Sequence, residues 1–522
     1  MLAAERVASG RMGEDAMVTA GAVASPHGAA TRAGLRALAD GGSAVDAAIT
    51  AAAVLAVVAP DQCGLGGDAV ALVARSPDEV ACFQGAGRSA RAVDVDEVRR
   101  AGSGQMPALG AHSVTVPGAL STWGAMHGHS GRLPWSTLLE PAREVAAEGF
   151  AVGERLHRSI AGSTDRMSAD AGLRSLVVPG GVPLAVGSRL RQPELAATLA
   201  VLAGEGPAAL YQGELGAQLL DFLRESGSAL SAADLAGHTC DLSSAVSTGW
   251  SGTRLWTAPP PSQGLLLFQI LAGMDDASGD RDWLGEGAGQ LANLFARSVR
   301  YREANLADPI GIPGLLDVGA WLATGDDGST PVRRPDGDTV AVVAVDDDGC
   351  FVSLIFSLFD GFGSGLRDPA TGIVLHNRGA GFTLDEGSPN CLAPGRRPAH
   401  SLMPVLVADA GGLLGAHGTM GGYGQPQIHA QLVLRLASGL TPQQAVAAPR
   451  FVVGRSDAGG PLRIAVERSA PGPMVAALQR AGLPVEMRAD RDPEVGHAQL
   501  VRRAADGALH VGTDPRADGL GQ

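Results

Sequence analysis

The stretch DTVAVVAVDDDGCFVSLIFSLF, residues 338–359, decides the fold. It opens with an unbroken β-prone run from Thr339 to Val345 and reaches a turn signal at residues 346–349. A second apolar run follows from Cys350 to Phe359. Two such runs joined by a short segment rich in Asp and Gly predict a β-hairpin. The first run is apolar throughout, which predicts a buried strand.

Thr339 stands at the boundary between this strand and a polar loop rich in Gly, Asp and Pro, residues 325–338. Threonine is common in strands, so its position alone indicates little. It gains meaning if the peptide bond after Asp338 is broken, because the Thr339 hydroxyl then lies beside a free α-amine. An α-amine has a pKa of about 8 and can serve as general base for the hydroxyl at neutral pH.

Working outward, strands and helices alternate in both halves of the chain. Strands are predicted at 22–24, 69–74, 405–407, 413–417 and 498–501. Helices are predicted at 29–39, 44–58, 264–271, 427–437 and 474–481, and residues 130–225 are predicted to be mostly helical. Residues 274–288 are polar and are predicted to form an exposed loop. Strands in both halves with helices between them predict an α+β fold of stacked layers, with helices outside and sheets inside.

The composition excludes several classes of function. Of 522 residues, 45% are hydrophobic and 18% are charged, and the net charge is −14, which is typical of a globular protein and argues against nucleic acid or an anionic membrane as partner. The chain has no lysine, which excludes phosphate-loop lysines, Schiff-base lysines and Ser–Lys dyads. The longest apolar run, Ala47 to Pro60, is too short to span a bilayer. No signal-peptide pattern follows Met1, so a cytoplasmic enzyme is expected.

Three weak patterns carry no function of their own. The glycine-rich segment Gly64–Ala69 follows a predicted helix rather than a strand, which argues against a dinucleotide site. His127 and His129 have no third ligand nearby and are predicted to lie in a surface loop. The five cysteines are scattered and include no C-x-x-C pair. No metal and no organic cofactor are therefore expected.

The sequence resembles the γ-glutamyltranspeptidase superfamily of N-terminal-nucleophile hydrolases along nearly its whole length. The segments that carry the resemblance keep the family's order and spacing. They are Gly41–Ala48, Gly64–Gly67, Val116–Gly118, Leu133–Trp135, Glu148–Phe150, Pro259–Gly264, Thr339–Asp346, Phe362–Gly365, Gly372, Arg397–Pro398, Met403–Pro404, Gly421–Gly422, Ala448–Phe451 and Thr513–Arg516. So many matches in the same order are highly specific for this superfamily.

The resemblance implies a four-layer αββα sandwich and self-cleavage before Thr339. A large subunit, residues 1–338, and a small subunit, residues 339–522, would then remain together as one heterodimeric globule. Thr339 would be the nucleophile, first in processing and then in catalysis. Gly421 and Gly422 match the pair whose backbone N–H groups form the oxyanion hole. Ser357 matches a hydroxyl residue that hydrogen-bonds the nucleophile.

The substrate positions depart from the family's pattern. Family members hold a γ-glutamyl group through an arginine and an aspartate. At the arginine position this chain has Gln84 or Ala86, with Arg88 available from a shifted register. The aspartate position is Gly381, which cannot supply a counter-charge to an ammonium group. An asparagine beyond the nucleophile is replaced by Phe359.

Further replacements point to a different acyl group. The family's Asn-Gln pair is Asn377-Arg378 here, and its Ser-Ser pair is His400-Ser401. The loop from Phe382 to Pro398 is short compared with the covering lid of many members, so a more open site is expected. The cationic candidates for binding a substrate carboxylate are Arg88, Arg91, Arg378 and His400. Together these residues favour a small carboxylate-bearing substrate without a fixed α-ammonium group.

Several functions remain open at this point. The favoured one is an amide hydrolase that resembles the oxamate amidohydrolase and glutathione hydrolase-like branches. A second is a tailoring hydrolase of secondary metabolism that removes an oxalyl-type fragment by C–C cleavage. A third is an uncleaved, non-catalytic homologue, which Val340 and Phe359 favour. The retained Thr339, Gly421 and Gly422 disfavour it. A true γ-glutamyl enzyme is the last, and water or an amine could be the acceptor.

Overall fold

The predicted hairpin is present in the computed structural model, which describes residues 17–18, 21–167, 170–276, 281–308, 338–455 and 460–522. Its strands are β10, Asp338–Asp346, and β11, Phe351–Phe359, paired antiparallel. All their residues after Asp338 are buried. The hairpin therefore lies inside the molecule, as its unbroken apolar sequence predicts.

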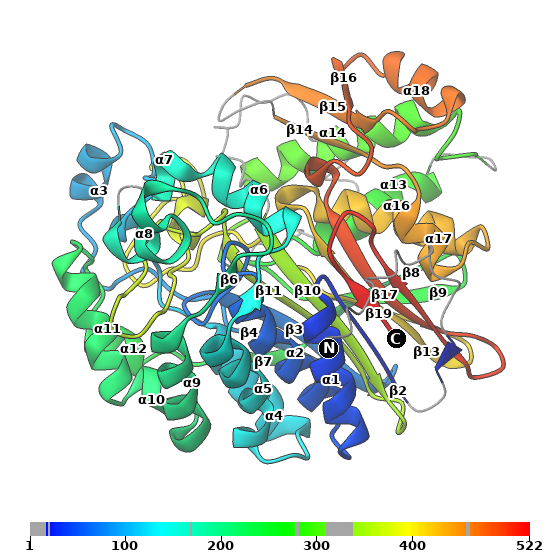
Figure 1. The fold of residues 1–522 in the computed structure, drawn as a ribbon. Helices are drawn as coiled ribbons and strands as arrows, with labels where there is room; N and C mark the ends of the chain where they lie inside the picture. The colour runs from blue at the N-terminus through cyan, green and yellow to red at the C-terminus, as the bar shows by residue number, and fades with distance from the viewer. Residues whose placement is uncertain (1–16, 19–20, 168–169, 277–280, 309–337, 456–459) are drawn as a thin grey trace, which may run out of the picture.

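Two seven-stranded sheets form the centre of the protein, and every strand pair in them is antiparallel (Figure 1). The first sheet has the order β19-β2-β10-β11-β3-β4-β7, with bounds Leu520–Gly521, Gly21–Ser25, β10, β11, Asp68–Ser76, Glu79–Gln84 and Asp241–Ser244. The second has the order β1-β18-β17-β13-β12-β9-β8, with bounds Met17–Val18, Leu509–Thr513, His497–Arg503, Gly412–Met420, Val405–Asp409, Thr253–Thr257 and Val246–Trp250.

The two sheets pack face to face because alternate side chains of each strand point to opposite faces. In β10, Ala341 and Val343 join a core cluster with residues of the second sheet, whereas Val340 and Val342 pack on the helical side. At Gly418 of β13 a Cβ atom would lie 2.7 Å from the Cβ of Ala341, so glycine permits the close approach of the sheets there. Both faces of β10 are thus covered.

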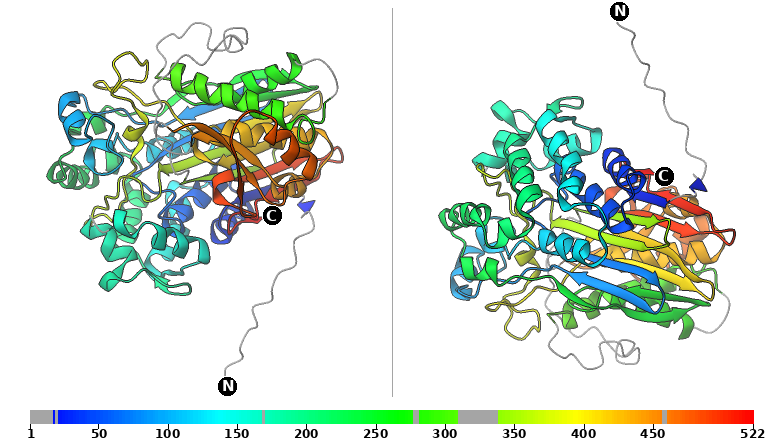
Figure 2. Two further views of the ribbon diagram at one scale, coloured as in Figure 1. Left: turned by 90° about the horizontal axis from the view of Figure 1, so that it is seen from above. Right: turned by 90° about the horizontal axis from the view of Figure 1, so that it is seen from below.

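Helices cover the outer faces of the two sheets. On the first sheet the cover is formed chiefly by α1 Gly28–Ala39, α2 Ala44–Val58, α4 Ala119–Ser130, α5 Trp135–Glu148 and α9 Pro193–Glu205. On the second sheet it is formed by α13 Leu265–Asp276, α14 Ala288–Asn305, α16 Gln425–Ala437 and a small sheet of β14 Phe451–Arg455, β15 Leu462–Glu467 and β16 Val485–Arg488. Figure 2 shows α14, in green, and α1, in blue, on opposite sides of the strands.

Shorter elements complete the chain. They are α3 Val95–Ala101, β5 Phe150–Ala151, α6 Glu154–Gly162, α7 Thr164–Met167, α8 Ala171–Val177, β6 Arg189–Leu190, α10 Ala208–Tyr211, α11 Glu214–Glu225, α12 Ala232–Ala236, α17 Pro442–Ala447 and α18 Gly472–Gln479. None of the helices in the described ranges combines the length and the apolar character needed to cross a membrane.

Most element predictions are confirmed, and α2 has the predicted bounds. One is wrong: His127 and His129 lie in the last turn of α4 rather than in a loop, where His127 Nε2 contacts the Leu133 carbonyl at 2.8 Å. The loop predicted at 274–288 is shorter than expected because α13 continues to Asp276. The predicted loop before Asp338 lies outside the described residues.

Candidate active site

The residues around Thr339 lie at the ends of three central strands of the first sheet. In the β10–β11 ladder Asp338 is opposite Phe359 and Val340 is opposite Phe356, so β11 carries one extra residue at this point. Such a bulge redirects side chains locally. Ser357 of β11 is in turn opposite Asp68, the first residue of β3. Three neighbouring strands thus place Thr339, Ser357 and Asp68 in one row, on the strand face that points toward the second sheet.

All hydrogen-bonding positions of the Ser357 hydroxyl are occupied in this row. Its Oγ lies 3.0 Å from Thr339 Oγ1, donates to the Asp338 carbonyl at 2.9 Å and accepts from the Phe359 N–H at 2.8 Å. A hydroxyl has one hydrogen and two acceptor positions. Because that hydrogen goes to the Asp338 carbonyl, the Thr339 hydroxyl donates to Ser357. The nucleophile candidate, only 1% exposed, is therefore linked to the carbonyl of its own preceding peptide bond.

Asp338 lies in an acidic environment that the sequence did not reveal. Burial and the neighbouring Asp61 raise the pKa of Asp338 to about 7. Arg155 binds Asp61 through two contacts of 2.7 and 3.0 Å, and Gln62 Nε2 approaches Asp338 Oδ1 at 3.5 Å. Because one arginine serves two neighbouring carboxyl groups, the second favours its neutral form.

Asp68 binds two of the predicted substrate residues. The Arg378 guanidinium contacts both Asp68 oxygens, at 2.7 and 3.0 Å, and His400 Nε2 lies 2.7 Å from Oδ2. Arg378 also donates to Ser401 Oγ at 3.0 Å. Burial alone would raise the pKa of Asp68, but Arg378 and His400 hold it well below its usual range. Arg378, His400 and Ser401 are thus brought together, and the charge of Arg378 is balanced by Asp68.

His400 is neutral in this arrangement. Burial, with the nearby Arg378, lowers the pKa of His400 to about 4. Its Nδ1 accepts from the Leu402 N–H at 3.2 Å, so the proton is on Nε2 and points to Asp68. Asp68 itself was not among the site residues predicted from the sequence. The available signal was an acidic residue opening an otherwise apolar strand after a glycine-rich turn.

Phe359 connects this group to the second sheet. Its ring lies 4.3 Å from the Arg378 guanidinium carbon and its centroid 6.4 Å from that of Tyr423. A Cβ atom at Gly381 would come within 3.8 Å of the ring. The backbone of Phe359 has a φ of 82°, which is strained for an aromatic residue. Phe359 and Gly381, two departures from the family pattern, are therefore neighbours in the structure.

Gly421 and Gly422 follow β13, immediately before Tyr423. Their φ angles are 149° and 53°, and a Cβ on Gly421 would meet Ile428 Cδ1 at 2.5 Å, so glycine is required there. Gln263 fixes the segment by donating to the Gly422 carbonyl at 2.8 Å and to the Ser401 carbonyl at 2.7 Å. Gln263 belongs to the matching segment Pro259–Gly264, but no role was predicted for it from the sequence.

Three further predicted residues have their partners outside the Asp68 group. Gln84, at the end of β4, donates to the Pro259 carbonyl at 3.0 Å. Asn377 donates to Asp360 at 2.7 Å and to a backbone carbonyl. Arg88 is half exposed and binds Asp308 at 3.1 Å, on the wall of a cavity of about 420 Å³. Arg88 is therefore separate from the Asp68 group.

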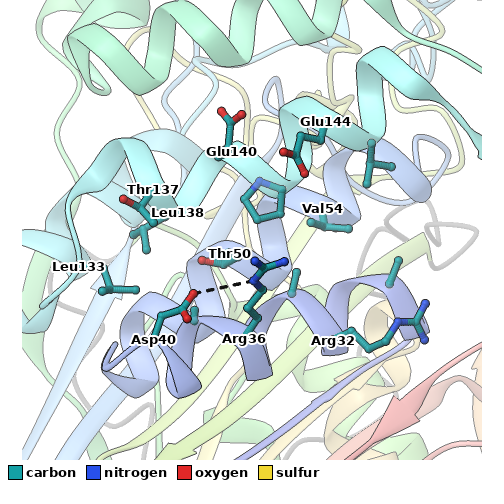
Figure 3. A pocket seen from close by; sticks show the side chains of 15 residues that line it. Arg32, Arg36, Asp40, Thr50, Val54, Leu133, Thr137, Leu138, Glu140 and Glu144 are labelled. Atoms are coloured by element: carbon teal, nitrogen blue, oxygen red, sulfur yellow. Dashed lines mark ion pairs between the residues drawn. The ribbon is translucent and has the colours of Figure 1, made fainter.

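A second cavity, of about 390 Å³, opens between α1, α2 and α5 (Figure 3). Arg32 and Arg36 line one wall and Glu140 and Glu144 the other. It lies in the helical layer outside the first sheet, whereas Thr339 faces the other way. Within the described residues, no group of three His, Cys, Asp or Glu side chains is placed to hold a metal ion.

The family model for gamma-glutamyltranspeptidase matches residues 30–521. The chain belongs to the gamma-glutamyltranspeptidase family. Its relatives include the glutathione hydrolase-like YwrD proenzyme of Bacillus subtilis (strain 168), which is 35% identical over 512 residues, covering 95% of this chain and 97% of the relative. The oxamate amidohydrolase proenzyme of Klebsiella pneumoniae is 32% identical over 527 residues, covering 96% of this chain and 98% of the relative.

Among solved structures, cephalosporin acylase from Bacillus halodurans matches with a TM-score of 0.89 and 30% identity, covering 100% of this chain and 99% of the acylase. This gamma-glutamyltranspeptidase family member therefore shares a mixed α/β fold with antiparallel sheets with an acylase. Relatives of this kind are hydrolases, and the family assigns the chain to the same enzyme class.

Proposed function

We propose that this family member is a proenzyme that cleaves itself between Asp338 and Thr339 and then uses Thr339 as an N-terminal nucleophile. The observation that carries the proposal is the Ser357 hydroxyl, which contacts both the Thr339 hydroxyl, at 3.0 Å, and the Asp338 carbonyl, at 2.9 Å. We infer further that the stacked sheets and helices form the four-layer αββα sandwich of N-terminal-nucleophile hydrolases.

In the processing step, Thr339 Oγ1 attacks the Asp338 carbonyl carbon, and the proton of its hydroxyl is passed on to the Thr339 nitrogen that becomes the leaving group, so that Ser357 stays a neutral hydroxyl. The carbonyl oxygen becomes an oxyanion, and the hydrogen bond that Ser357 already makes to it becomes stronger as charge develops. The C–N bond then breaks, the nitrogen keeps the proton that Thr339 Oγ1 lost and becomes the free α-amine, and an ester joins the Asp338 carbonyl carbon to Thr339 Oγ1. Water hydrolyses the ester, which frees the Asp338 carboxylate, the Thr339 hydroxyl and the Thr339 α-amine.

In catalysis the new α-amine takes the Thr339 hydroxyl proton while the oxygen attacks an amide carbonyl. The backbone N–H groups of Gly421 and Gly422 serve as oxyanion donors. The leaving amine takes the proton, an acyl ester remains on Thr339 and water releases the acid. Loss of one such donor typically raises the barrier by about 3 kcal/mol.

For the substrate we propose a small acyl group that bears a carboxylate and no fixed α-ammonium group. Phe359 and Gly381 offer no counter-charge to an ammonium. Arg378, held by Asp68, has N–H groups beyond those three that bind Asp68 and Ser401. Gln84, Asn377, His400 and Ser401 would surround the acyl group, and Arg88 would bind a more distant part of the substrate. Oxamate-like amides, with glutathione beside them, are the first compounds to screen.

The test compares the purified wild type with Thr339→Ala by intact mass and N-terminal sequencing. Ser353→Ala, on the same strand β11, is the matched control for folding. Two fragments in the wild type and in Ser353→Ala, with Thr339 as a new N-terminus, and one uncut chain in Thr339→Ala are expected. An uncut wild-type chain would contradict self-cleavage, and hydrolysis of oxamate-like amides by Thr339→Ala would contradict its role as nucleophile.

A further inference from the structure

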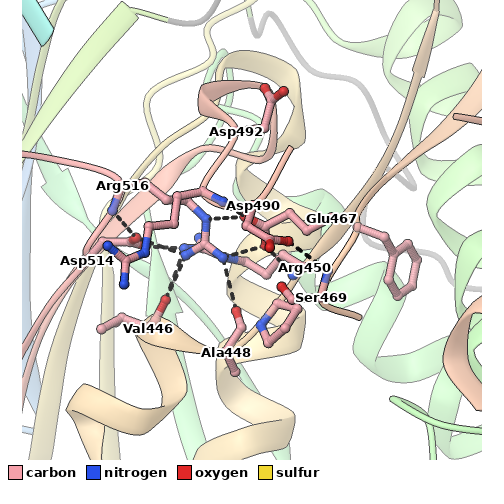
Figure 4. Close-up of polar contacts among 12 residues, drawn as sticks. Val446, Ala448, Arg450, Glu467, Ser469, Asp490, Asp492, Asp514 and Arg516 are labelled. Carbon is pink, nitrogen blue, oxygen red and sulfur yellow. Dashed lines mark hydrogen bonds and ion pairs between the residues drawn. The ribbon is translucent and has the colours of Figure 1, made fainter. Parts of the chain in front are cut away.

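A second group of buried charges lies beside the second sheet, where α17, β14, β15 and the end of β18 meet (Figure 4). Arg450 contacts Asp514, and Arg516 binds Asp514 at 2.9 Å and Glu467 Oε1 at 2.9 Å. The side chains of these four residues are at most 2% exposed. Two guanidinium groups and two carboxylates therefore form a closed, water-excluded network.

Arg435 of α16 adds a third guanidinium to this network. It is 4% exposed and donates to the Ala445 and Pro449 carbonyls, which are neutral acceptors. Burial, with the positive charges of Arg450 and Arg516, lowers the pKa of Arg435 to about 9, so it stays charged at neutral pH. Three buried cations thus face two buried anions.

The neighbouring titratable groups do not correct this excess. His497 is neutral at neutral pH because burial lowers its pKa to about 4. Asp490 is exposed and is held by the Ser469 N–H at 2.7 Å, and it faces the positive charges of Arg468 and Arg491. One buried positive charge therefore remains unbalanced, which is costly in a low-dielectric interior.

Arg450 also has unused hydrogen-bond donors. Its Nη2 donates to the Val446 carbonyl at 3.1 Å and contacts Asp514. Its Nε and Nη1 are buried and have no partner among the described residues. Unpaired donors on a fully buried cation are rare and need an acceptor. An acceptor that balances the one excess positive charge and also binds the two unpaired Arg450 donors carries a single negative charge and is small.

We infer that Arg450, with Arg435 beside it, binds a small monovalent anion of the halide type, such as chloride, inside this layer. The ion accepts from Arg450 Nε and Nη1 and cancels the excess positive charge. A doubly charged anion such as sulfate would reverse the imbalance, and a larger carboxylate would need more room than a packed interior leaves.

The anion would act on stability, through the strands that carry the glycine pair. Asp514 accepts from the Ala498 N–H at 3.0 Å, which fixes the start of β17. There His497 is opposite Met420, the residue before Gly421. Release of the anion would leave one positive charge of the three arginines uncompensated and the Arg450 donors unpaired, and would weaken the whole layer, while Thr339 and Ser357 stay in place on the first sheet.

The experiment is thermal unfolding of the full chain at constant ionic strength in sodium chloride, sodium bromide or sodium gluconate, whose anion is too bulky to enter. A saturable rise of Tm on the order of 2 °C in both halides is expected. In bromide-soaked crystals, an anomalous peak in contact with the Arg450 guanidinium is expected. Equal Tm values in all three salts, or a peak only elsewhere, would overturn the inference.

Arg435→Met tests the charge imbalance directly. With two cations and two anions left, this variant should lose the halide-dependent rise of Tm. Arg36→Met, on the exposed face of α1, is the matched control and should keep the full rise. A halide response that survives in Arg435→Met would overturn the proposed role of the excess charge. If Arg435→Met does not fold, the wild-type Tm values in the three salts and the bromide peak still test whether the anion binds.

Discussion

The Ser357 hydroxyl contacts the nucleophile candidate, the preceding carbonyl and the backbone of its own strand. We expect Ser357→Ala to slow self-cleavage by about 100-fold, since one hydrogen-bond donor to the developing oxyanion is lost. The buried Phe359 N–H also loses its acceptor, which should cost about 1–3 kcal/mol of stability. A gel time course after expression measures the processing rate.

Ser357→Thr is the matched control for this prediction, because it keeps a hydroxyl at the same position and should process at close to the wild-type rate. If Ser357→Ala matures as fast as the wild type, the hydroxyl plays no part in the cleavage. If the threonine variant is as slow as the alanine variant, packing rather than hydrogen bonding controls the rate.

Phe359 is also a residue-scale feature, because its φ of 82° is unusual for a side chain of its size. We expect Phe359→Gly to be more stable than Phe359→Ala by about 1 kcal/mol, since glycine adopts this conformation without strain. At Phe356, on the same strand but without a positive φ, the order should reverse. Urea unfolding of the four variants measures both differences, and the same order at both positions would rule out strain at Phe359.

At the scale of elements, sequence reasoning was most successful where one physical rule acts alone. The predicted bounds of α2 agree with the structure, where Ser43 caps the helix through a capping box with Asp46 and an apolar run follows. The hairpin was predicted because a turn signal separates two β-prone runs. Strand boundaries differed by a residue or more, since pairing with a neighbour rather than propensity ends a strand.

The site was only partly predictable, for a reason that Asp68 makes clear. Its partners Arg378 and His400 are more than 300 residues away in sequence, in segments that follow β11 along the chain, and β11 lies beside β3 in the sheet. Local sequence patterns do not show which strands are neighbours in a sheet. The bulge that directs Ser357 toward Thr339 likewise depends on the register of two strands. Thr339, Ser357 and the glycine pair came from the family resemblance, and their catalytic roles stay predictions.

The contact between Asp68 and Arg378 leads to an element-scale prediction. Asp68→Asn leaves a buried, unpaired guanidinium and should lower the free energy of unfolding by about 3–5 kcal/mol. The double variant Asp68→Asn with Arg378→Met removes both charges and should recover much of this loss. A double-mutant cycle by urea unfolding measures the coupling, and strictly additive losses would show that the two residues do not stabilise each other.

For the whole molecule, buried histidines determine the response to acid. Four are buried with lowered pKa values: His400, His417, His429 and His497. Below the ordinary value of 6.5 the unfolded chain binds protons that the folded chain refuses, so stability is lost as pH falls from about 6.5 toward 4. Each residue contributes a slope of up to about 1.4 kcal/mol per pH unit.

Asp338 acts in the opposite direction, because a pKa raised to about 7 gives stability that is lost as pH rises through that value. The four buried histidines together outweigh Asp338. The urea midpoint should therefore fall clearly as the pH is lowered from about 7 to about 5. His417→Gln should make this fall shallower, and it leaves the site untouched because His417 faces the helices outside the second sheet. A midpoint that does not change over this range would contradict the prediction.

The two segments on either side of the proposed cut are interleaved in both sheets. In the first sheet β10 and β11 lie between β2 and β3, and in the second β12 pairs with β9. Neither segment can leave without unpairing strands of the other, so a cleaved molecule comes apart only by unfolding. Cleavage would therefore change the molecularity of unfolding: an intact chain melts at a temperature independent of how dilute it is, whereas the matured pair becomes less heat-resistant with every dilution.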